Sequence, residues 1–381
     1  MTRKRHRFAQ RRRACGYSQE EFAEAVGVER TTVARWETTE TEPQPWHRRR
    51  IAKVLQVSIK ELADLLADFV DAEHDRQVSP DDAIGSPSDE GAADLRERLL
   101  NAAAVDDHVV ALLASQADRI REFDRMLGAR AAASQLDGHL TTLELLRTFT
   151  VSARQREPLA DLYADAAALA GWQCLDLGDL LMAWRRHEAA KDAGRECRSL
   201  AALVHAMAQQ AYVLVELGEP GVALELAECA RATAGTAVPP LLSSWLSAVQ
   251  GELHAEAGHA RACRSAFESA ERLLPKDSHD PELPYIVLDP IHLARWRGNA
   301  LARLGDAAAT ADLRRALDGL DASFTRARAA LHVDLAYALL AADRRGEAEA
   351  ELGEAKTLAT RVGSARQRRR IRRLESVLQT A

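Results

Sequence analysis

The first part of the chain has short apolar runs at helical spacing, separated by turn residues. The pattern predicts helices over 19–26 and 30–37, and Ser18 with Glu21 forms a capping box at the start of the first. Gly27 lies between them and is expected to form the tight turn, because a left-handed backbone conformation costs glycine little free energy. One helix is expected before this pair and two after it. The region up to residue 70 is therefore predicted to be a five-helix domain.

A second pattern repeats about every forty residues in the remainder of the chain. Similar turn sequences occur at Gly178, Gly218, Gly258 and Gly305, with a fifth at Asp343. Seven residues before each turn lies a small residue: Gly171, Ala211, Gly251, Gly298 and Ala336. Small residues at a fixed offset let two antiparallel helices approach closely. The spacing predicts stacked helix pairs, so the whole chain is expected to be all-α.

Two features depart from the regular spacing. A weaker unit precedes the others, with its turn expected at Gly138, forty residues before Gly178. The longer interval before Gly305 contains four prolines over 275–290, which exclude a continuous helix. This insertion either covers a groove or forms a surface loop, and the loop is the simpler interpretation.

Charge divides the chain more clearly than composition does. The 381 residues carry a formal net charge of −6, are 47% hydrophobic and include 6 Trp, 5 Tyr and 7 Phe. Residues 1–70 sum to +4, residues 71–94 to −7 and residues 95–381 to −3. The acidic segment contains Ser, Pro and Gly and little apolar periodicity, so it is predicted to be a flexible linker. The expected domains are therefore 1–70 and 95–381, joined by the linker 71–94.

Several classes of protein are excluded by the sequence. No uninterrupted apolar run approaches ~18 residues, and no apolar stretch follows the basic N-terminus, so neither a membrane span nor a signal peptide is expected. The five cysteines are widely spaced, which argues against a zinc site. His187 and Glu188 lack a second histidine, because position 191 is Lys191. We expect no enzyme activity, no metal, no cofactor and a cytoplasmic location.

The N-terminal region resembles the Xre/phage-repressor family of helix-turn-helix domains over residues 8–66. The resemblance rests on Y-S-Q-E-E-F-A, the V-G-V turn, T-x-x-R-W-E and I-A-K-V-L-Q-V-S-I-K-E-L. It implies that the helix over 30–37 enters the major groove of operator DNA. The implied contacts, with those of a basic N-terminal arm, are Gln19, Arg30, Thr31, Thr32, Arg35, Arg5 and Arg7. Arg11 and Glu29 depart from the family pattern, and a domain that binds protein instead of DNA is the alternative.

The repeats resemble tetratricopeptide repeats, with a period longer than the usual ~34 residues. That resemblance implies a C-terminal α-solenoid whose concave groove is lined by the first helix of each pair. The residues expected there are Trp172, His205, Tyr212, Trp245, Glu252, His292, Arg295, Asn299 and Tyr337. In quorum-sensing proteins of this class, groove asparagines hold a peptide backbone, and Asn299 has a suitable offset. The alternative is that the tryptophans pack between repeats and the polar residues are solvated.

The combined prediction is a bacterial transcriptional regulator of the quorum-sensing type. It is expected to bind an inverted-repeat operator as a nucleoid-associated homodimer, and to take a peptide or small-molecule signal in its groove. The alternative is an interaction scaffold whose groove recruits a protein partner, with no small ligand. A basic cluster over 361–373 is expected to be a solvated charged face, and contact with DNA or with the linker is its alternative.

Overall fold

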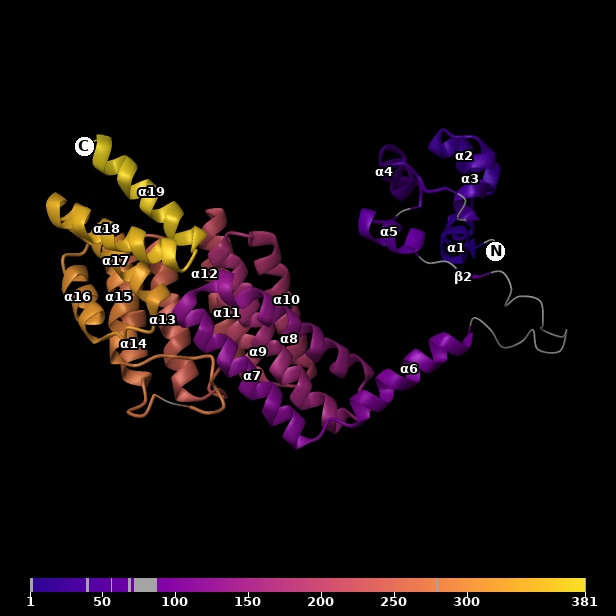
Figure 1. The fold of residues 1–381 in the computed structure, drawn as a ribbon. Coiled ribbons are helices and arrows are strands. Elements are labelled where there is room, and N and C mark those ends of the chain that lie inside the picture. Colours follow the sequence, from indigo (N-terminus) through magenta and orange to yellow (C-terminus); the bar gives the residue numbers. More distant parts are fainter. Residues whose placement is uncertain are drawn as a thin grey trace. The chain divides into compact units, whose positions relative to one another are not determined.

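The computed structural model describes residues 3–38, 41–55, 57–67, 70–71, 88–278 and 280–380. They divide into two compact units, Met1–Ala92 and Ala93–Ala381, which are described separately below (Figure 1). The predicted linker over 71–94 lies mostly outside the described residues. Its final part is helical, because α6 (Ser88–Ala103) begins within it.

The described residues up to 71 form the five predicted helices of the N-terminal unit. They are α1 (His6–Ala14), α2 (Gln19–Val26), α3 (Arg30–Glu37), α4 (Pro45–Val54) and α5 (Ile59–Ala67). Ser18 and Glu21 form the predicted capping box, and Gly27 ends α2 with a φ of 78°. Because these signals are local, α2 and α3 begin and end where the sequence predicts.

A small core and a pair of short strands hold this unit together. Phe8 and Phe22 pack edge to face with their ring centroids 6.0 Å apart, and Trp36 is buried in the same cluster. The two-residue strands β1 (Arg3–Lys4) and β2 (Val70–Asp71) pair in antiparallel fashion. The two ends of the domain are therefore joined through the backbone.

The second unit is a stack of helices connected mostly by short turns, with a longer segment between Leu273 and Pro290. After α6 the elements are α7 (Asp107–Leu127), α8 (Ala129–Phe149), α9 (Ala153–Leu177), α10 (Leu180–Glu196), α11 (Leu200–Leu217), α12 (Pro220–Ala234), α13 (Pro240–Glu256), α14 (Ala260–Leu273), α15 (Pro290–Arg303), α16 (Ala309–Gly319), α17 (Thr325–Ala341), α18 (Arg345–Arg361) and α19 (Ala365–Thr380). From α7 to α18 consecutive helices pack as pairs, and the first helix of each pair packs against the first helix of the next. This arrangement is the predicted α-solenoid.

The turns of the regular repeats lie where the spacing predicts them. Left-handed φ values of 58–88° occur at Gly178, Gly218, Gly258, Gly305 and Asp343. Gly251 shows why the preceding small residue is needed, because a Cβ atom there would lie 2.5 Å from the Phe267 ring. The close approach of α13 and α14 thus depends on the absence of a side chain at this position.

The first helix pair does not follow the forty-residue pattern. Gly138 lies inside α8, so the prediction of a turn there is wrong. The turn of this pair is Gly128, with a φ of 84°. A Cβ atom on Gly128 would lie 2.3 Å from the carbonyl oxygen of Val362, which follows α18. The beginning of the solenoid therefore lies against its C-terminal part.

The two ends of the solenoid pack against each other. Helix α17 contacts α7 and α19 contacts α9, and Figure 1 shows α7 (purple) reaching the orange and yellow C-terminal helices. Arg326 on α17 forms an ion pair with the buried Asp124 on α7 at 2.7 Å. Ser364, just before α19, donates a hydrogen bond to Asp176 on α9 at 2.6 Å. We call this contact of α7 and α9 with α17 and α19 the closure seam.

Part of the C-terminal basic cluster is used within the fold. Arg366 and Arg369 form ion pairs with Glu216 on α11 at 2.6 and 3.0 Å. Burial raises the pKa of Glu216, but the two arginines outweigh it and leave that pKa below its usual value. The prediction of a solvated charged face is therefore wrong for these two arginines, because both are half-buried and paired with Glu216.

One helix in the described part of the chain, α11, is long and apolar enough to cross a membrane by length and composition. It packs against α9, α10, α12 and α13. Ala206, Ala208 and Ala211 on this helix are fully buried. The apolar composition is that of a central solenoid helix with neighbours on several sides.

Candidate functional site

One face of α3 carries most of the residues expected to contact DNA. Its exposed and half-exposed side chains include Arg30, Thr31, Thr32 and Arg35. Arg30 forms an exposed ion pair with Glu20 at 2.9 Å. The face presents two guanidinium groups and two hydroxyls, which are donors suited to base edges and phosphates.

Gln19, at the start of α2, is held by a hydrogen-bond network. Its Nε2 donates to Glu37 at 2.7 Å, and Arg12 donates to the other oxygen of Glu37 at 2.8 Å. Arg12 also donates to the carbonyl of Tyr17 at 2.6 Å. The network fixes the half-buried side chain of Gln19, and it places one of the basic N-terminal residues inside the fold.

Arg5 is not part of an exposed basic arm. It is only 3% exposed, and its guanidinium donates to the carbonyl oxygens of Leu66 at 2.6 Å, Trp36 at 2.9 Å and Thr41 at 3.0 Å. The prediction that Arg5 contacts DNA is wrong, because its side chain is buried and these bonds, with an ion pair to Glu42 at 3.2 Å, hold its guanidinium group within the domain. Arg7 is exposed.

The two departures from the family pattern have local explanations. Arg11 donates to the carbonyl of Leu55 at the end of α4, at 3.0 Å, so a cation caps a helix where an apolar side chain was expected. Glu29 precedes α3 and accepts a hydrogen bond from the Thr31 hydroxyl at 3.3 Å. Neither residue disturbs the predicted helix bounds.

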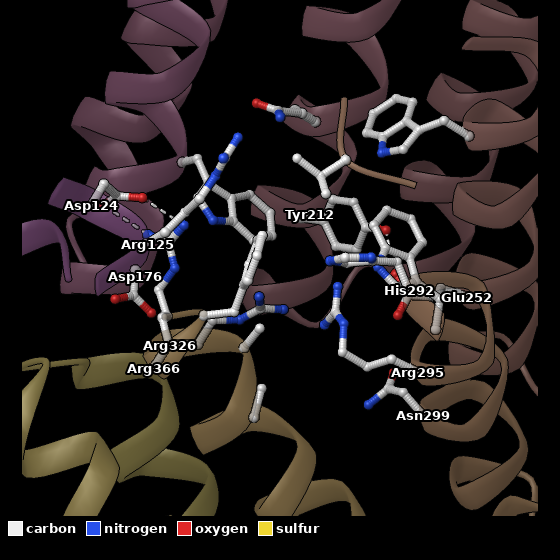
Figure 2. Close-up of a pocket in the computed structure, with 18 of the residues that line it drawn as sticks. Asp124, Arg125, Asp176, Tyr212, Glu252, His292, Arg295, Asn299, Arg326 and Arg366 are labelled. Atoms are coloured by element: carbon white, nitrogen blue, oxygen red, sulfur yellow. Dashed lines mark hydrogen bonds and ion pairs between the residues drawn. The ribbon is translucent and has the colours of Figure 1, made fainter. Parts of the chain in front are cut away.

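The solenoid surrounds a cavity of about 250 Å³ (Figure 2). Eight of the nine residues expected in the groove line it: Trp172, His205, Tyr212, Trp245, Glu252, His292, Arg295 and Asn299. The ninth, Tyr337, is 44% exposed and lines a neighbouring pocket of about 420 Å³ beside α19. Asp334 is the last residue of α17 that reaches the cavity. Tyr337 lies almost one turn beyond it, so it lines the neighbouring pocket and not the central cavity.

Aromatic rings form one wall of this central cavity. The ring of His205 lies 4.9 Å from that of Trp245 and 4.3 Å from that of Tyr285, and Trp172 and Tyr212 meet edge to face at 5.7 Å. Burial lowers the pKa of His205 to about 3, with a further contribution from the charges of other residues, so its ring is neutral at pH 7. The wall is therefore apolar although it includes an imidazole.

The proline-rich insertion covers part of the cavity. Tyr285 and Val287 line it, while Leu283, Ile286 and Leu288 are buried. The interpretation as a surface loop is wrong, because alternate side chains of this segment anchor it to the helices.

Hydrogen bonds join polar groups of neighbouring helices around the cavity. Tyr212 donates to Glu252 at 2.5 Å, and burial raises the pKa of Glu252 above its usual value. Asn299 donates to Asp334 at 2.6 Å, and Arg370 from α19 donates to the same oxygen. The amide of Asn299 is thus engaged with the protein, so holding a peptide backbone would compete with this bond.

Sequence reasoning missed the cavity residues that the closure seam and the insertion contribute. They include Arg125, Tyr285, Trp296, Phe324, Arg326, Arg366 and Arg370. The sequence could have identified Trp296 as a cavity residue, since it follows Arg295 on the same helix. The others come from α7, the first turn of α17, α19 and irregular segments, which lie outside the repeat positions used for the prediction. Within the described ranges no group of three His, Cys, Asp or Glu side chains is arranged to hold a metal ion.

Comparison with protein families adds one match. A family model described as helix-turn-helix matches residues 8–62. The N-terminal unit is an Xre-type helix-turn-helix domain. Arg5 lies before the matched range and Leu66 after it. The helix-turn-helix domain of this chain is therefore completed by a bond between its two flanking segments.

The search of curated proteins gives no match. Among solved structures, PlcR of Bacillus thuringiensis in complex with the peptide PapR7 and DNA is similar at 13% identity, covering 81% of this chain and 91% of that chain, with a TM-score of 0.36. A putative kinesin light chain from Podospora anserina with nearly identical TPR-like repeats is similar at 16% identity, covering 51% of this chain and 94% of that chain, with a TM-score of 0.34.

Proposed function

We propose that the protein is a bacterial transcriptional regulator that binds operator DNA through its helix-turn-helix domain. The observation that carries the proposal is the exposed face of α3. Its Arg30, Thr31 and Thr32 lie at the N-terminal end of the helix, where residues of this motif reach base edges. Arg35 and Gln19 follow as contacts to bases or phosphates, and Arg7 as a phosphate contact.

The regulator acts as a cytoplasmic, nucleoid-associated homodimer. Two helix-turn-helix domains of one dimer occupy half-sites about 34 Å apart, or a multiple of that distance. Such spacing requires an inverted-repeat operator. The solenoid supplies the dimer contact in this scheme.

The cavity of the solenoid binds a peptide or small-molecule signal. A concave space that combines aromatic rings with convergent polar and charged groups can hold and orient a ligand. Because the cavity includes residues from both sides of the closure seam, a bound ligand stabilises the closed solenoid relative to an opened one. Only such a difference in affinity for two conformations allows a ligand to change operator binding.

Operator binding is tested with the full-length protein on the DNA upstream of its own gene. We expect footprint protection at low salt, about 50 mM, and a steep decrease of affinity as salt rises. Arg35→Ala weakens binding about tenfold or more, since one guanidinium contact is worth ~1–3 kcal/mol. The exposed Arg261→Ala on α14 is the control and leaves affinity unchanged. Absence of protection at low salt contradicts the proposal.

A further inference from the structure

The charged groups around the central cavity are unequally paired. Seven arginines and six carboxylates line it. Each of these carboxylates accepts a hydrogen bond from a side chain in the described part of the chain. Each acidic group of the cavity thus already has a side-chain donor, although one oxygen of Asp165 and one of Asp176 are buried without a partner in the described structure.

Two of the lining arginines, Arg125 and Arg295, form no ion pair with any described residue. Their guanidinium groups instead lie near aromatic rings, Arg125 at 5.5 Å from the centroid of Phe324 and Arg295 at 5.7 Å from that of Trp296. Burial lowers the pKa of both arginines, and for Arg295 it outweighs the opposing effect of Glu252 and Asp334. Figure 2 shows the two on different sides of the cavity.

Unused hydrogen-bond donors occur at the same place. Arg295 Nε and Trp296 Nε1, on adjacent positions of α15, are buried from solvent and have no partner in the described structure. Both groups are donors only, so an acceptor must satisfy them. A carboxylate has two acceptor oxygens and the charge that matches an arginine.

Aromatic residues make up much of the remaining wall. Trp172, Trp245 and Trp296 line the cavity together with Tyr212, Tyr285 and Phe324. The chain has only 6 Trp, 5 Tyr and 7 Phe, so a third of its aromatic residues face this one space. With a volume of about 250 Å³, below the ~300–1,000 Å³ of most ligand pockets, the cavity admits a compact ligand.

We propose that the cavity binds a compact organic anion in which a carboxylate is attached to an apolar group, with the carboxylate on Arg295 and Trp296 Nε1. Arg125 supplies the second positive charge, and the aromatic wall holds the apolar part. The proposal rests on the proposed function of the cavity as a signal site. Two sources share this chemistry: the C-terminal carboxylate of a short peptide and a free organic acid.

Matched pairs of probes test the proposal by intrinsic tryptophan fluorescence and calorimetry of the full-length protein without DNA. One pair is 4-phenylbutyrate and its amide, and the other is a tripeptide ending in phenylalanine and its C-terminal amide. We expect the acid of at least one pair to bind about tenfold or more tightly than its amide, because a charged hydrogen bond is lost with the carboxylate. The pair that binds identifies the source. Equal binding of acid and amide, or no binding of either acid at millimolar concentration, overturns the proposal.

Variants locate the binding group. Arg295→Gln is expected to lower the affinity of the acid about tenfold or more and to remove its preference over the amide. The control is Arg261→Gln, at an exposed position on α14. It is expected to keep both the affinity for the acid and the preference for the acid over the amide. Retained preference in Arg295→Gln overturns the assignment to Arg295. If that variant does not fold by circular dichroism, Arg125→Gln is measured instead, and an unchanged preference counts against the site in the same way.

The outcomes separate this proposal from the proposed regulatory function. Binding of an acid that leaves operator affinity unchanged supports the anion site and contradicts the role of the cavity as a signal receptor. An operator response to molecules without any preference for a carboxylate supports the receptor role and contradicts the anion site.

Discussion

Arginine has three different roles in this protein, and its environment decides which. Arg30 and Arg35 are exposed on α3, Arg5 is buried among backbone carbonyls, and Arg295 faces the cavity without an ion-pair partner among the described residues. The guanidinium group carries five donors in each case. Because Arg5 and Arg35 have the same side chain, the presence of basic residues in the sequence does not show which of them contact DNA and which form buried bonds within the fold.

Replacement of Arg5 by Met tests the structural role of this arginine. We expect a loss of about 2–4 kcal/mol in the stability of the N-terminal unit, because buried carbonyls of three segments lose their donor. Hydrogen exchange of α1, α3 and α5 in the full-length protein measures it. Arg7→Met, at an exposed position, is the control and changes stability by less than about 0.5 kcal/mol. Equal effects of the two substitutions would show that Arg5 is not a brace.

Glycine determines how closely the paired helices of the solenoid approach. A Cβ atom on Gly171 would lie 2.6 Å from the His187 ring, and one on Gly298 would lie 2.7 Å from Leu313. These distances are shorter than a van der Waals contact, so the second helix would have to move. At this scale the sequence is informative, since the small residues recur at one offset from each turn.

A pair of glycine substitutions tests this element-scale interpretation. Gly251→Ala is expected to destabilise the solenoid by about 1–3 kcal/mol, because its Cβ would meet the Phe267 ring at 2.5 Å. Gly138→Ala is the matched control inside α8, where an added Cβ meets nothing within 4 Å. It should stabilise by up to ~1 kcal/mol through helix propensity. Urea unfolding measures both, and a destabilised Gly138→Ala would instead agree with a turn at that position.

Closure of the solenoid converts its concave groove into a cavity. Arg326 and Asp124, 202 residues apart, form one of the bonds that hold the first and last helices together. Asp124 is 1% exposed, and burial raises its pKa even though Arg326 opposes the shift. The closure seam therefore contains a buried ion pair. Removing Arg326 would leave the Asp124 carboxylate buried without its cation, at a large cost in the free energy of folding.

Arg326→Gln tests the importance of the closure seam. The variant leaves the Asp124 carboxylate buried without its cation, which typically costs about 3–5 kcal/mol. We expect faster hydrogen exchange in α7, α17 and α19, with α11 to α14 unchanged. Arg314→Gln removes a half-exposed ion pair with Glu347 and should cost less than ~1 kcal/mol. Uniform exchange throughout the solenoid in Arg326→Gln would contradict a local opening of the seam.

The sequence by itself determined the elements of this protein and most of one face of the cavity. Capping boxes, left-handed turn positions and small residues act over a few residues, so they are visible in a single chain. The repeat then presents equivalent positions of successive helices to the same side. For that reason eight cavity residues, from Trp172 to Asn299, were predictable from their offsets.

Only the tertiary structure decided where the two ends of the solenoid meet. Closure depends on the accumulated rotation of many repeats, and no local pattern encodes that sum. It brings Arg366 and Arg370 to the cavity and leaves Tyr337 outside it. The same holds for Arg5, whose partners Trp36 and Leu66 are distant in the chain. The chemistry of each side chain is thus set by the sequence, while its partner, and so its role, is set by packing.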